Sequence, residues 1–410
     1  MAAEEKQNNK AVLLFATRFE SKQSPNAICL KSVINSFPNN YRFIVISSRE
    51  SIDEPELITR GRVTTYQLYN SYGAFLAKKW LPEKMWKIEL FARRVLSVIN
   101  PWPLFLWEKR AFSLASKIVA ENNICLLISN SLPFSCHGPA KKIKKQHPSI
   151  PWVAYVLDPF TKNPICHSKN PIANILSTIK EKAVFQECDR IVTLSNLEYD
   201  DCLNKKIARV GIPLLDGSTI SLQGGLGNGC LTYGGSFLRG VREPQNVLQI
   251  IEAYCRRYPD GLVQFSFYTN IESRDAEAIA QTAANFSEVK VQGYIPKEEM
   301  NDVLKASMGL VSIGNLSPLQ IPSKVIEYVG FGRPVVHFAF CQDDPVVPFL
   351  KEYPLSCVVY LDASVDANVN QLRQFILSIR NLDSVEYERG PYLKSCESEY
   401  TAKLIEELAS

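Results

Sequence analysis

The sequence predicts an α/β protein built from two doubly wound domains that face each other across a cleft. Short apolar runs alternate with helical patterns along most of the chain, which is typical of parallel sheets covered by helices. The 410 residues are enough for two domains, and 46% of them are hydrophobic, so each domain can bury a core. Residues 211–230 are rich in Gly and Asn and predict a linker between the two series.

The first half supplies the elements of one domain, predicted over residues 1–210. Its strands are expected in the apolar runs AVLLFAT, YRFIVISS, ICLLISN, PWVAYVLD and RIVTLS. A helical pattern follows the first run (NAICLKSVINSF), a basic helix follows the third, and a short helix follows the fifth. We therefore expect a parallel sheet with crossover helices in this half.

The second half repeats the alternation more regularly over residues 231–390. Its predicted strands are LTYGG, LVQFSFYT, VKVQG, MGLVSI, PVVHF and CVVYL, and a helical pattern follows each of them. These strands are nearly continuous apolar runs, as expected for a sheet that is covered on both faces. Residues 391–410 predict a C-terminal helix whose destination the sequence leaves open.

Charge and cysteine content narrow the class of protein. Residues 1–205 hold 28 Lys and Arg against 18 Asp and Glu, a net +10, and the rest hold 18 against 24, a net −6. The 11 cysteines are scattered without metal-binding or disulfide spacing, which favours a reduced, cytoplasmic protein. No apolar run is long enough for a signal peptide or a transmembrane helix, so neither is predicted.

The most informative segment is QIPSKVIEYVGFGRPVV, residues 320–336. Pro322 suits a first helical position, and the N–H groups of the following turn could bind an anion, with the charge of Lys324 beside it. Ser323 and Glu327 are four residues apart on one helix face, where a carboxylate can accept both hydroxyls of a ribose. Phosphate at the helix tip and sugar hydroxyls beside it predict a nucleoside diphosphate site.

A second segment agrees with this prediction. In LTYGGSFLRGVREPQNVLQIIEAY, residues 231–254, a strand runs into Gly234 and Gly235 before a helix. Glycine allows a diphosphate to approach the backbone closely, and Arg239 and Arg242 would neutralise it.

Together these two segments resemble the donor site of GT-B-fold glycosyltransferases of the bacterial family 4 type. In that type a P-S/N-K-x-x-E-Y helix precedes a G-R/K-P-V turn, and the resemblance extends over most of residues 11–390. It implies two Rossmann-type domains, a nucleotide-sugar donor on the second domain, and Gly234, Gly235, Arg242, Ser323 and Glu327 as donor contacts. It also implies that Arg239 and Lys324 stabilise the leaving diphosphate.

The first domain contains a stretch that is similar to the acceptor domain of the same family. SNSLPFSCHGPAKKIKKQHPSIPWVAYVLDPFTKNP, residues 129–164, ends its strand in an aspartate, Asp158, that the resemblance brings to the cleft as a catalytic group. The loop after the first strand occupies the position of the family's acceptor-side loop. The candidate acceptor contacts are Arg18, Ser24, Asn26 and His137.

The chain also departs from the family. A second glutamate is often found eight positions before the helix glutamate, and here that position is Leu319, so a site with two carboxylates is not supported. The acceptor loop lacks the usual glycine pair. No DxD sequence occurs, so neither a metal nor another cofactor is predicted, and the nucleotide sugar is a co-substrate.

A basic, aromatic stretch sets the first domain apart. Residues 70–145 hold 13 Lys and Arg against 4 Asp and Glu, and four tryptophans lie between residues 78 and 110. This composition suits the surface of an anionic membrane. A basic face could also bind nucleic acid, but the resemblance to a glycosyltransferase donor site argues against nucleic acid as the partner. The stretch could equally be an internal helix with a solvated basic edge.

These observations predict a cytoplasmic glycosyltransferase, peripheral at the inner face of the membrane, that acts on a glycan or lipid-linked acceptor. The resemblance implies retention of configuration without a metal, with the departing diphosphate assisting the incoming hydroxyl. Two alternatives stay open. One is a nucleotide-sugar epimerase on the same fold, and the other is a non-catalytic partner in a glycan-assembly complex.

Overall fold

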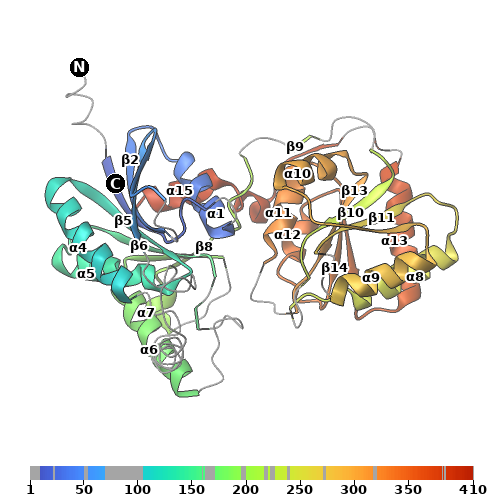
Figure 1. Ribbon diagram of the computed structural model, residues 1–410, viewed down its shortest axis with the longest axis horizontal. Helices are drawn as coiled ribbons and strands as arrows, with labels where there is room; N and C mark the ends of the chain where they lie inside the picture. The colour runs from blue at the N-terminus through green and yellow to red at the C-terminus, as the bar shows by residue number, and fades with distance from the viewer. Residues whose placement is uncertain are drawn as a thin grey trace, which may run out of the picture. The chain divides into compact units, whose positions relative to one another are not determined.

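The computed structural model describes residues 10–21, 24–49, 54–69, 105–158, 160–161, 171–194, 200–216, 220–221, 227–237, 241–270, 274–316, 321–380, 382 and 385–409. The chain divides into two compact units, which are described separately. The first unit contains residues 1–213 and 398–410, and the second contains residues 214–397. Figure 1 shows a sheet with helices in each unit.

The first unit is built on an eight-stranded sheet with the order β3-β4-β2-β1-β5-β6-β7-β8. All neighbouring strands are parallel except β3, which is antiparallel to β4. The strands are β1 (Lys10–Phe15), β2 (Tyr41–Arg49), β3 (Leu57–Arg60), β4 (Val63–Tyr69), β5 (Ile124–Ser131), β6 (Trp152–Val156), β7 (Arg190–Thr193) and β8 (Ile207–Arg209). Every residue of β6 is buried, because helices cover both faces of the sheet.

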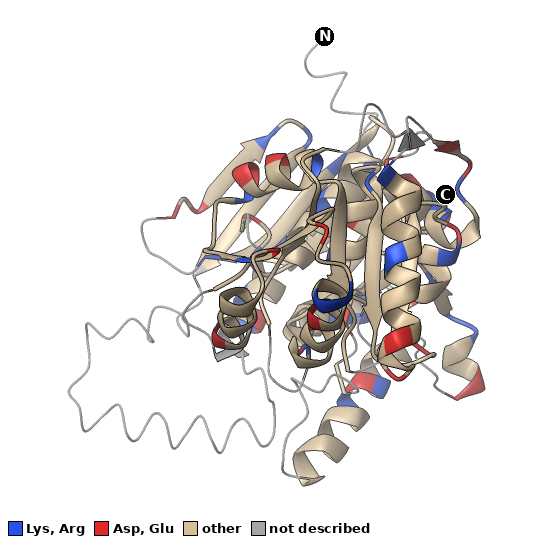
Figure 2. Cartoon of the chain, turned by 90° about the vertical axis from the view of Figure 1, so that its right-hand side faces the viewer, with Lys and Arg blue, Asp and Glu red and all other residues tan. Residues whose placement is uncertain are grey.

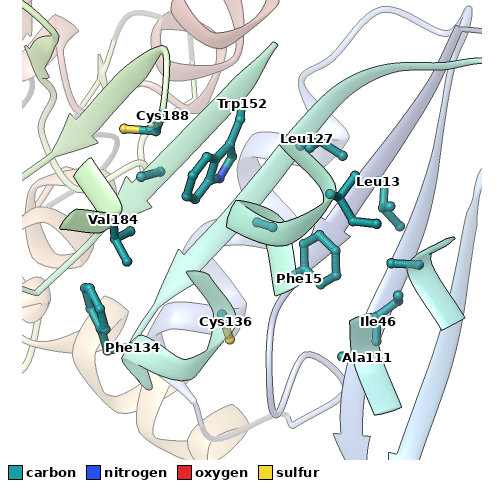
Figure 3. Close-up of a cluster of buried hydrophobic side chains, with 14 of the residues drawn as sticks. Leu13, Phe15, Ile46, Ala111, Leu127, Phe134, Cys136, Trp152, Val184 and Cys188 are labelled. Atoms are coloured by element: carbon teal, nitrogen blue, oxygen red, sulfur yellow. The ribbon is translucent and has the colours of Figure 1, made fainter. Parts of the chain in front are cut away.

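Helices of the first unit pack on these strands and close its core. They are α1 (Pro25–Asn35), α4 (Phe105–Glu121), the 3-10 helix η1 (Phe134–Cys136), α5 (His137–Gln146), α6 (Pro171–Phe185), α7 (Asp201–Asn204) and α15 (Ser398–Glu406). Figure 3 shows Leu13 and Phe15 of β1 in a buried cluster with Trp152 of β6, Ala111 of α4 and Val184 of α6. Alternate strand residues therefore form a core beneath α4, α5 and α6.

Some elements were not expected from the sequence. β3 and β4 form a hairpin at Gly61, whose φ is +55°, and β8 adds a short edge strand. Three of the four residues of β3 are exposed. An edge strand buries little apolar surface, so its sequence lacks the apolar run that signals a buried strand.

The C-terminal helix α15 returns to the first unit. It packs against α1, and the hydroxyls of Ser36 and Ser398 lie 2.7 Å apart. Arg190 Nη1 donates to the carbonyl of Leu404 at 3.0 Å. These contacts answer the question of where the last helix lies, which the sequence leaves open.

The second unit is a six-stranded, fully parallel sheet with the order β12-β11-β10-β13-β14-β15. The strands are β10 (Cys230–Gly234), β11 (Gln264–Tyr268), β12 (Val289–Gln292), β13 (Gly309–Ile313), β14 (Val335–Ala339) and β15 (Ser356–Tyr360), and β9 (Ile220–Ser221) pairs with β16 (Glu386–Tyr387). Strand order reverses between β10 and β13, so the ligand crevice of such a sheet is expected at their carboxyl ends.

The helices of the second unit follow the strands in the predicted alternation. They are α8 (Gln245–Arg257), α9 (Arg274–Asn285), α10 (Lys297–Ala306), α11 (Ser323–Gly330), α12 (Val347–Lys351), α13 (Val365–Arg380) and α14 (Pro391–Lys394). Figure 2 shows that the strands are largely without charged residues, which gather on helices and loops.

The two sheets confirm the predicted α/β class with doubly wound topology. Within the described ranges, no helix is long and apolar enough to cross a membrane.

Candidate functional site

The carboxyl end of β10 meets the start of α11 in the second unit. Lys324 Nζ donates to the carbonyl oxygen of Gly234, and the hydroxyl of Tyr328 lies 3.4 Å from both the amide nitrogen and the carbonyl oxygen of the same glycine. A Cβ on Gly235 would lie 3.0 Å from Tyr233 Oη and 3.4 Å from Lys324 Nζ. The glycine therefore leaves room for the lysine beside the strand end.

The helix α11 forms as the sequence predicts, with one small shift. Pro322 is the N-cap, with ψ of 109°, rather than the first helical residue, and the helix starts at Ser323. Val325, Ile326 and Val329 are buried, as expected. The helix ends before Gly332, whose φ of +66° is the left-handed conformation of a C-terminal cap.

Three charged side chains lie near Lys324 at this strand end. Burial lowers the pKa of Lys324, Glu327 opposes that shift, and Arg242 and Lys297 add to it. Glu327 Oε1 lies 3.4 Å from Lys297 Nζ at the start of α10, and 28% of the glutamate side chain is exposed. The carboxylate can therefore exchange this solvent-exposed ion pair for another partner at little cost.

Arg242 reaches the neighbouring strand turn. Its Nη2 donates to Asn315 Oδ1 at 2.8 Å, and the Leu316 amide donates to the Val241 carbonyl at 2.8 Å. The loops after β10 and β13 are thus joined at the topological switch point. The other predicted arginine, Arg239, lies outside the described residues.

A buried polar chain supports the same edge of the sheet. Carboxylate oxygens only accept, so His337 Nε2 of β14 donates to Asp344 Oδ2 at 3.2 Å, and its Nδ1 lies 3.0 Å from Ser312 Oγ of β13. Asp344 Oδ1 also accepts from the Val346 amide at 2.9 Å. Asp344 and Asn315 were not expected at this site from the sequence, because ordinary turn residues give no distinct pattern.

Replacing Asp344 by Ala should destabilise the second unit. The change leaves His337 Nε2 and the Val346 amide buried without acceptors, at about 1–3 kcal/mol for each group. We expect the melting temperature to fall by roughly 4–8 °C at the lower end of this cost, and by more at the upper end. Differential scanning calorimetry can measure this against the exposed neighbour variant Asp343→Ala, and equal melting temperatures for the two variants would contradict the expectation.

In the first unit, Asp158 follows β6 and lies beside the first turn of α1. Asn26 Nδ2 donates to the carbonyl of Ser131 at 3.2 Å, and Ser131 Oγ donates to the carbonyl of Asp158 at 3.4 Å. Burial raises the pKa of the Asp158 carboxyl, and a hydrogen bond from the Asn26 side chain partly opposes this. Two residues predicted from distant segments, Asn26 and Asp158, therefore meet at the carboxyl ends of the strands.

A buried glutamate holds the turn after Asp158. Glu181 of α6 is 1% exposed, and its carboxylate accepts from the amides of Phe160 and Thr161 at 3.3 and 3.4 Å. The Phe160 ring stacks on Phe134 with centroids 4.4 Å apart. Sequence reasoning missed Glu181, because a single acid in a helical pattern gives no hint that it is buried.

Two other acceptor candidates, Ser24 and Arg18, belong to the segment between β1 and α1. Ser24 caps α1, since its Oγ accepts from the Ala27 amide at 3.4 Å. Arg18 is exposed in the loop after β1, with a positive φ of 57° that is uncommon for a residue other than glycine. Such conformations gather at functional sites, which agrees with an acceptor role for this loop.

The position of His137 differs from the expectation that it contacts the acceptor. Its side chain is fully buried, and Nδ1 lies 2.7 Å from Ser129 Oγ; the same hydroxyl accepts a hydrogen bond from Trp152 Nε1 at 2.8 Å. Burial lowers the pKa of His137 to about 3, so the ring is neutral. The apolar sheet face beneath α5 encloses the ring, so it lies in the core instead of presenting an acceptor contact at the surface.

The comparisons with known proteins concern the fold. The two doubly wound units define a GT-B-fold protein, and solved structures of that fold align along nearly the whole chain. No protein-family model and no curated protein sequence matches the chain.

Three of the similar structures illustrate the match. An α,α-trehalose 6-phosphate synthase from Burkholderia multivorans has a TM-score of 0.60 at 11% identity, with 98% of this chain and 96% of that chain covered. A trehalose-6-phosphate structure from E. coli, bound with UDP-2-fluoro glucose, has a TM-score of 0.55 at 10% identity, covering 98% and 99%. TarM has a TM-score of 0.56 at 10% identity, covering 98% and 96%. At these identities the likeness shows the fold, and the family 4 type stays a prediction.

Proposed function

We propose that the chain is a glycosyltransferase that moves a sugar from a nucleoside diphosphate sugar to an acceptor. The main support is the strand end at β10, where the ammonium of Lys324, the Gly234–Gly235 pair and the start of α11 lie together. A strand, a glycine turn and a helix N-terminus at a switch point suit a diphosphate. The E. coli neighbour bound with UDP-2-fluoro glucose is consistent with this class of donor.

The proposed roles follow from these positions. Lys324, Arg242 and Arg239 stabilise the departing diphosphate, while Ser323 and Glu327 hold the nucleotide. The bond from the anomeric carbon to the diphosphate breaks, and a bond to the acceptor oxygen forms on the same face. The proton of the acceptor hydroxyl passes to the diphosphate. Asp158, with Asn26 beside it, orients that hydroxyl in the first unit.

We propose a glycan or lipid-linked precursor as the acceptor, with the enzyme peripheral at the inner membrane face. The support is the basic, aromatic composition of residues 78–110, most of which lie outside the described residues. A metal-independent reaction is expected, since the sequence has no DxD.

A thermal-shift screen with nucleotide sugars tests the donor class. The nucleotide that stabilises the protein identifies the donor, because only a ligand of the native state raises the melting temperature. Turnover assays then separate the alternatives. Donor conversion without an added acceptor would indicate an epimerase, and binding without any turnover would indicate a non-catalytic partner.

Replacing Glu327 by Ala should weaken binding of the nucleoside diphosphate by about tenfold or more. Each hydrogen bond between the carboxylate and a ribose hydroxyl is worth about 1.5–3 kcal/mol. Lys297→Ala is the matched control: it breaks the same ion pair but keeps the ribose acceptor, so its affinity should stay close to that of the parent protein. Isothermal titration calorimetry gives both values, and an unchanged affinity in folded Glu327→Ala protein would remove the ribose assignment.

A further inference from the structure

Helix α6 carries apolar side chains on two opposite faces. One face, with Ala173, Val184 and Phe185, is buried in the first unit. The other carries four large apolar side chains that are exposed: Ile172 by 62%, Ile175 by 59%, Leu176 by 38% and Ile179 by 60%. Spacings of three, four and seven residues place these four on one stripe.

This stripe is unusual for a surface helix. Single exposed apolar side chains need no explanation, but a contiguous group of them marks an interaction surface. Among the described residues, 11 large apolar side chains are exposed, and four of them lie on these two turns of α6. Figure 2 shows this helix, at the bottom of the view, without charged residues along its first part.

The border of the stripe is basic. Lys180 and Lys182 lie in the second half of α6, and the neighbouring α5 holds four further lysines and no acid. The two helices are in contact, since Lys141 Nζ donates to the carbonyl of Ala183 at 2.7 Å. The one acid of the pair, Glu181, is buried and engaged with the turn after Asp158. Six lysines minus one glutamate leave a formal charge of +5 on α5 and α6.

Part of this charge is already paired. Lys144, Lys145 and Lys182 lie within ion-pair distance of Asp189, Glu187 and Asp200. The pairs of Lys145 and Lys182 lie at exposed positions and are weak, so an anionic headgroup can replace their carboxylates, whereas the Lys144 side chain is only 13% exposed. Lys142 is exposed and lies 5.4 Å from the centre of the Phe112 ring. Lys142, Lys145 and Lys182 are therefore exposed basic side chains on α5 and α6, whereas Lys180 is half-buried.

We propose that the outer face of α6, with Ile175, Leu176 and Ile179 at its centre, docks on an anionic lipid surface. An aliphatic stripe with a lysine border suits a helix that lies in the plane of the membrane interface. The stripe has no aromatic residue and no arginine, the types that dominate binding energy at protein interfaces. The inference rests on the proposed function, in which the acceptor is lipid-linked.

The opposite face of α6 connects this surface to the candidate acceptor site. Glu181 lies on the buried face and holds the amides of Phe160 and Thr161, just after Asp158. The helix that meets the lipid is therefore the one that positions the turn next to the catalytic candidate. Docking through α6 would place this turn close to a lipid-linked acceptor.

Vesicle sedimentation of the full chain tests the proposal. We compare the parent protein with a double variant, Ile175→Ser with Ile179→Ser, on phosphatidylcholine vesicles with and without phosphatidylglycerol. The matched control is Val365→Ser with Leu377→Ser, which changes two exposed apolar residues of α13 in the other unit. We expect parent and control to bind the anionic vesicles, and the α6 variant to bind them at least about tenfold more weakly.

Each other outcome overturns the proposal. Equal binding of the parent protein and the α6 variant would mean that α6 makes no lipid contact. A lower melting temperature of the α6 variant would mean that the chain itself covers the stripe. A parent dimer that the α6 variant loses in light scattering would identify a second copy as the occupant.

Nucleotide binding is measured on the same proteins without vesicles. UDP and GDP titrations should give equal affinities for the parent protein and the α6 variant. Retained nucleotide binding with no lipid effect would refute the docking surface alone. A lipid effect without nucleotide binding would refute the proposed function and leave the surface intact.

Discussion

Asp158→Asn should lower the turnover number by about a hundredfold or more while the affinity for the donor nucleotide stays the same. The substitution keeps the shape of the side chain and removes its charge. The nucleotide is held by the second unit in the proposed function, so only the acceptor step is expected to suffer. Steady-state kinetics and calorimetric titration of the nucleotide measure the two effects separately.

The same variant should be at least as stable as the parent protein at neutral pH. Burial raises the pKa of the Asp158 carboxyl above its ordinary value, so the native state disfavours the ionised form relative to the unfolded chain. A carboxyl of this kind destabilises the native state as pH rises through that interval, and a neutral Asn removes the cost. Loss of activity without loss of stability is the signature of a functional charge.

The pH dependence of activity gives an independent measure of the Asp158 carboxyl. Activity that needs the Asp158 carboxylate should fall as pH drops through its raised pKa. Asn26→Ala removes the hydrogen bond that favours the ionised form, so the acid limb should move to higher pH.

A control variant separates the loss of turnover in Asp158→Asn from a general effect of losing an acidic charge. Asp201→Asn changes an exposed acid of the same unit and should keep parent activity. Normal transfer by Asp158→Asn would return Asp158 to the role of a turn-former.

Lys324→Met should lower turnover of the donor by about a hundredfold to a thousandfold, the range found when a single charge-stabilising donor is removed. The ammonium lies beside Gly234 and Gly235 and would face the charge that develops on the leaving diphosphate. The variant should also bind a nucleoside diphosphate more weakly than the parent protein does, while its affinity for the nucleoside should be unchanged. Binding titrations with both ligands and single-turnover kinetics measure these effects.

Lys324→Met should make the protein more stable, although it lowers activity. Burial lowers the pKa of Lys324, so the native state disfavours its charged form, and Met removes that cost. Lys351→Met changes an exposed lysine of the same unit and should leave both activity and nucleotide affinity unchanged.

Variants of Arg239 and Arg242 also test the assignment of the groups that stabilise the leaving diphosphate. Arg239→Lys keeps the charge but loses the bidentate fork and should remain impaired. If the alanine variants of Lys324, Arg242 and Arg239 all convert donor at the parent rate, the leaving-group assignment is wrong.

The alternation of apolar runs with helical patterns was sufficient to predict both sheets. Strands that are buried on both faces need continuous apolar sequence, so β10, β13 and β14 are visible in the sequence by themselves. The edge strands β3 and β8 were missed because they bury little surface. The start of α11 was predicted to within one residue, because Pro322 and the helix pattern are local signals.

The sequence predicted few of the contacts between distant segments. The sequence suggested that Asn26 and Asp158 share a site, but it gave no sign that Glu181 holds the adjoining turn from 20 residues away. Asn315 and Asp344 became relevant only when β13 was placed beside β10, and β14 beside β13. A side chain's partners depend on strand order, which local pattern does not encode.

The sequence by itself determined the two doubly wound sheets and the strand, glycine pair and helix start around Gly234 and Ser323, because backbone propensity and apolar periodicity act over a few neighbouring residues. Only the tertiary structure decided which polar groups are buried and which apolar faces are exposed. His137 follows a strand in the sequence, yet it is enclosed in the core. On α6 both faces carry apolar side chains and the buried face also holds Glu181, so periodicity cannot tell which of the two the sheet will cover. Burial is a property of the packed chain, since it depends on what the other elements leave open.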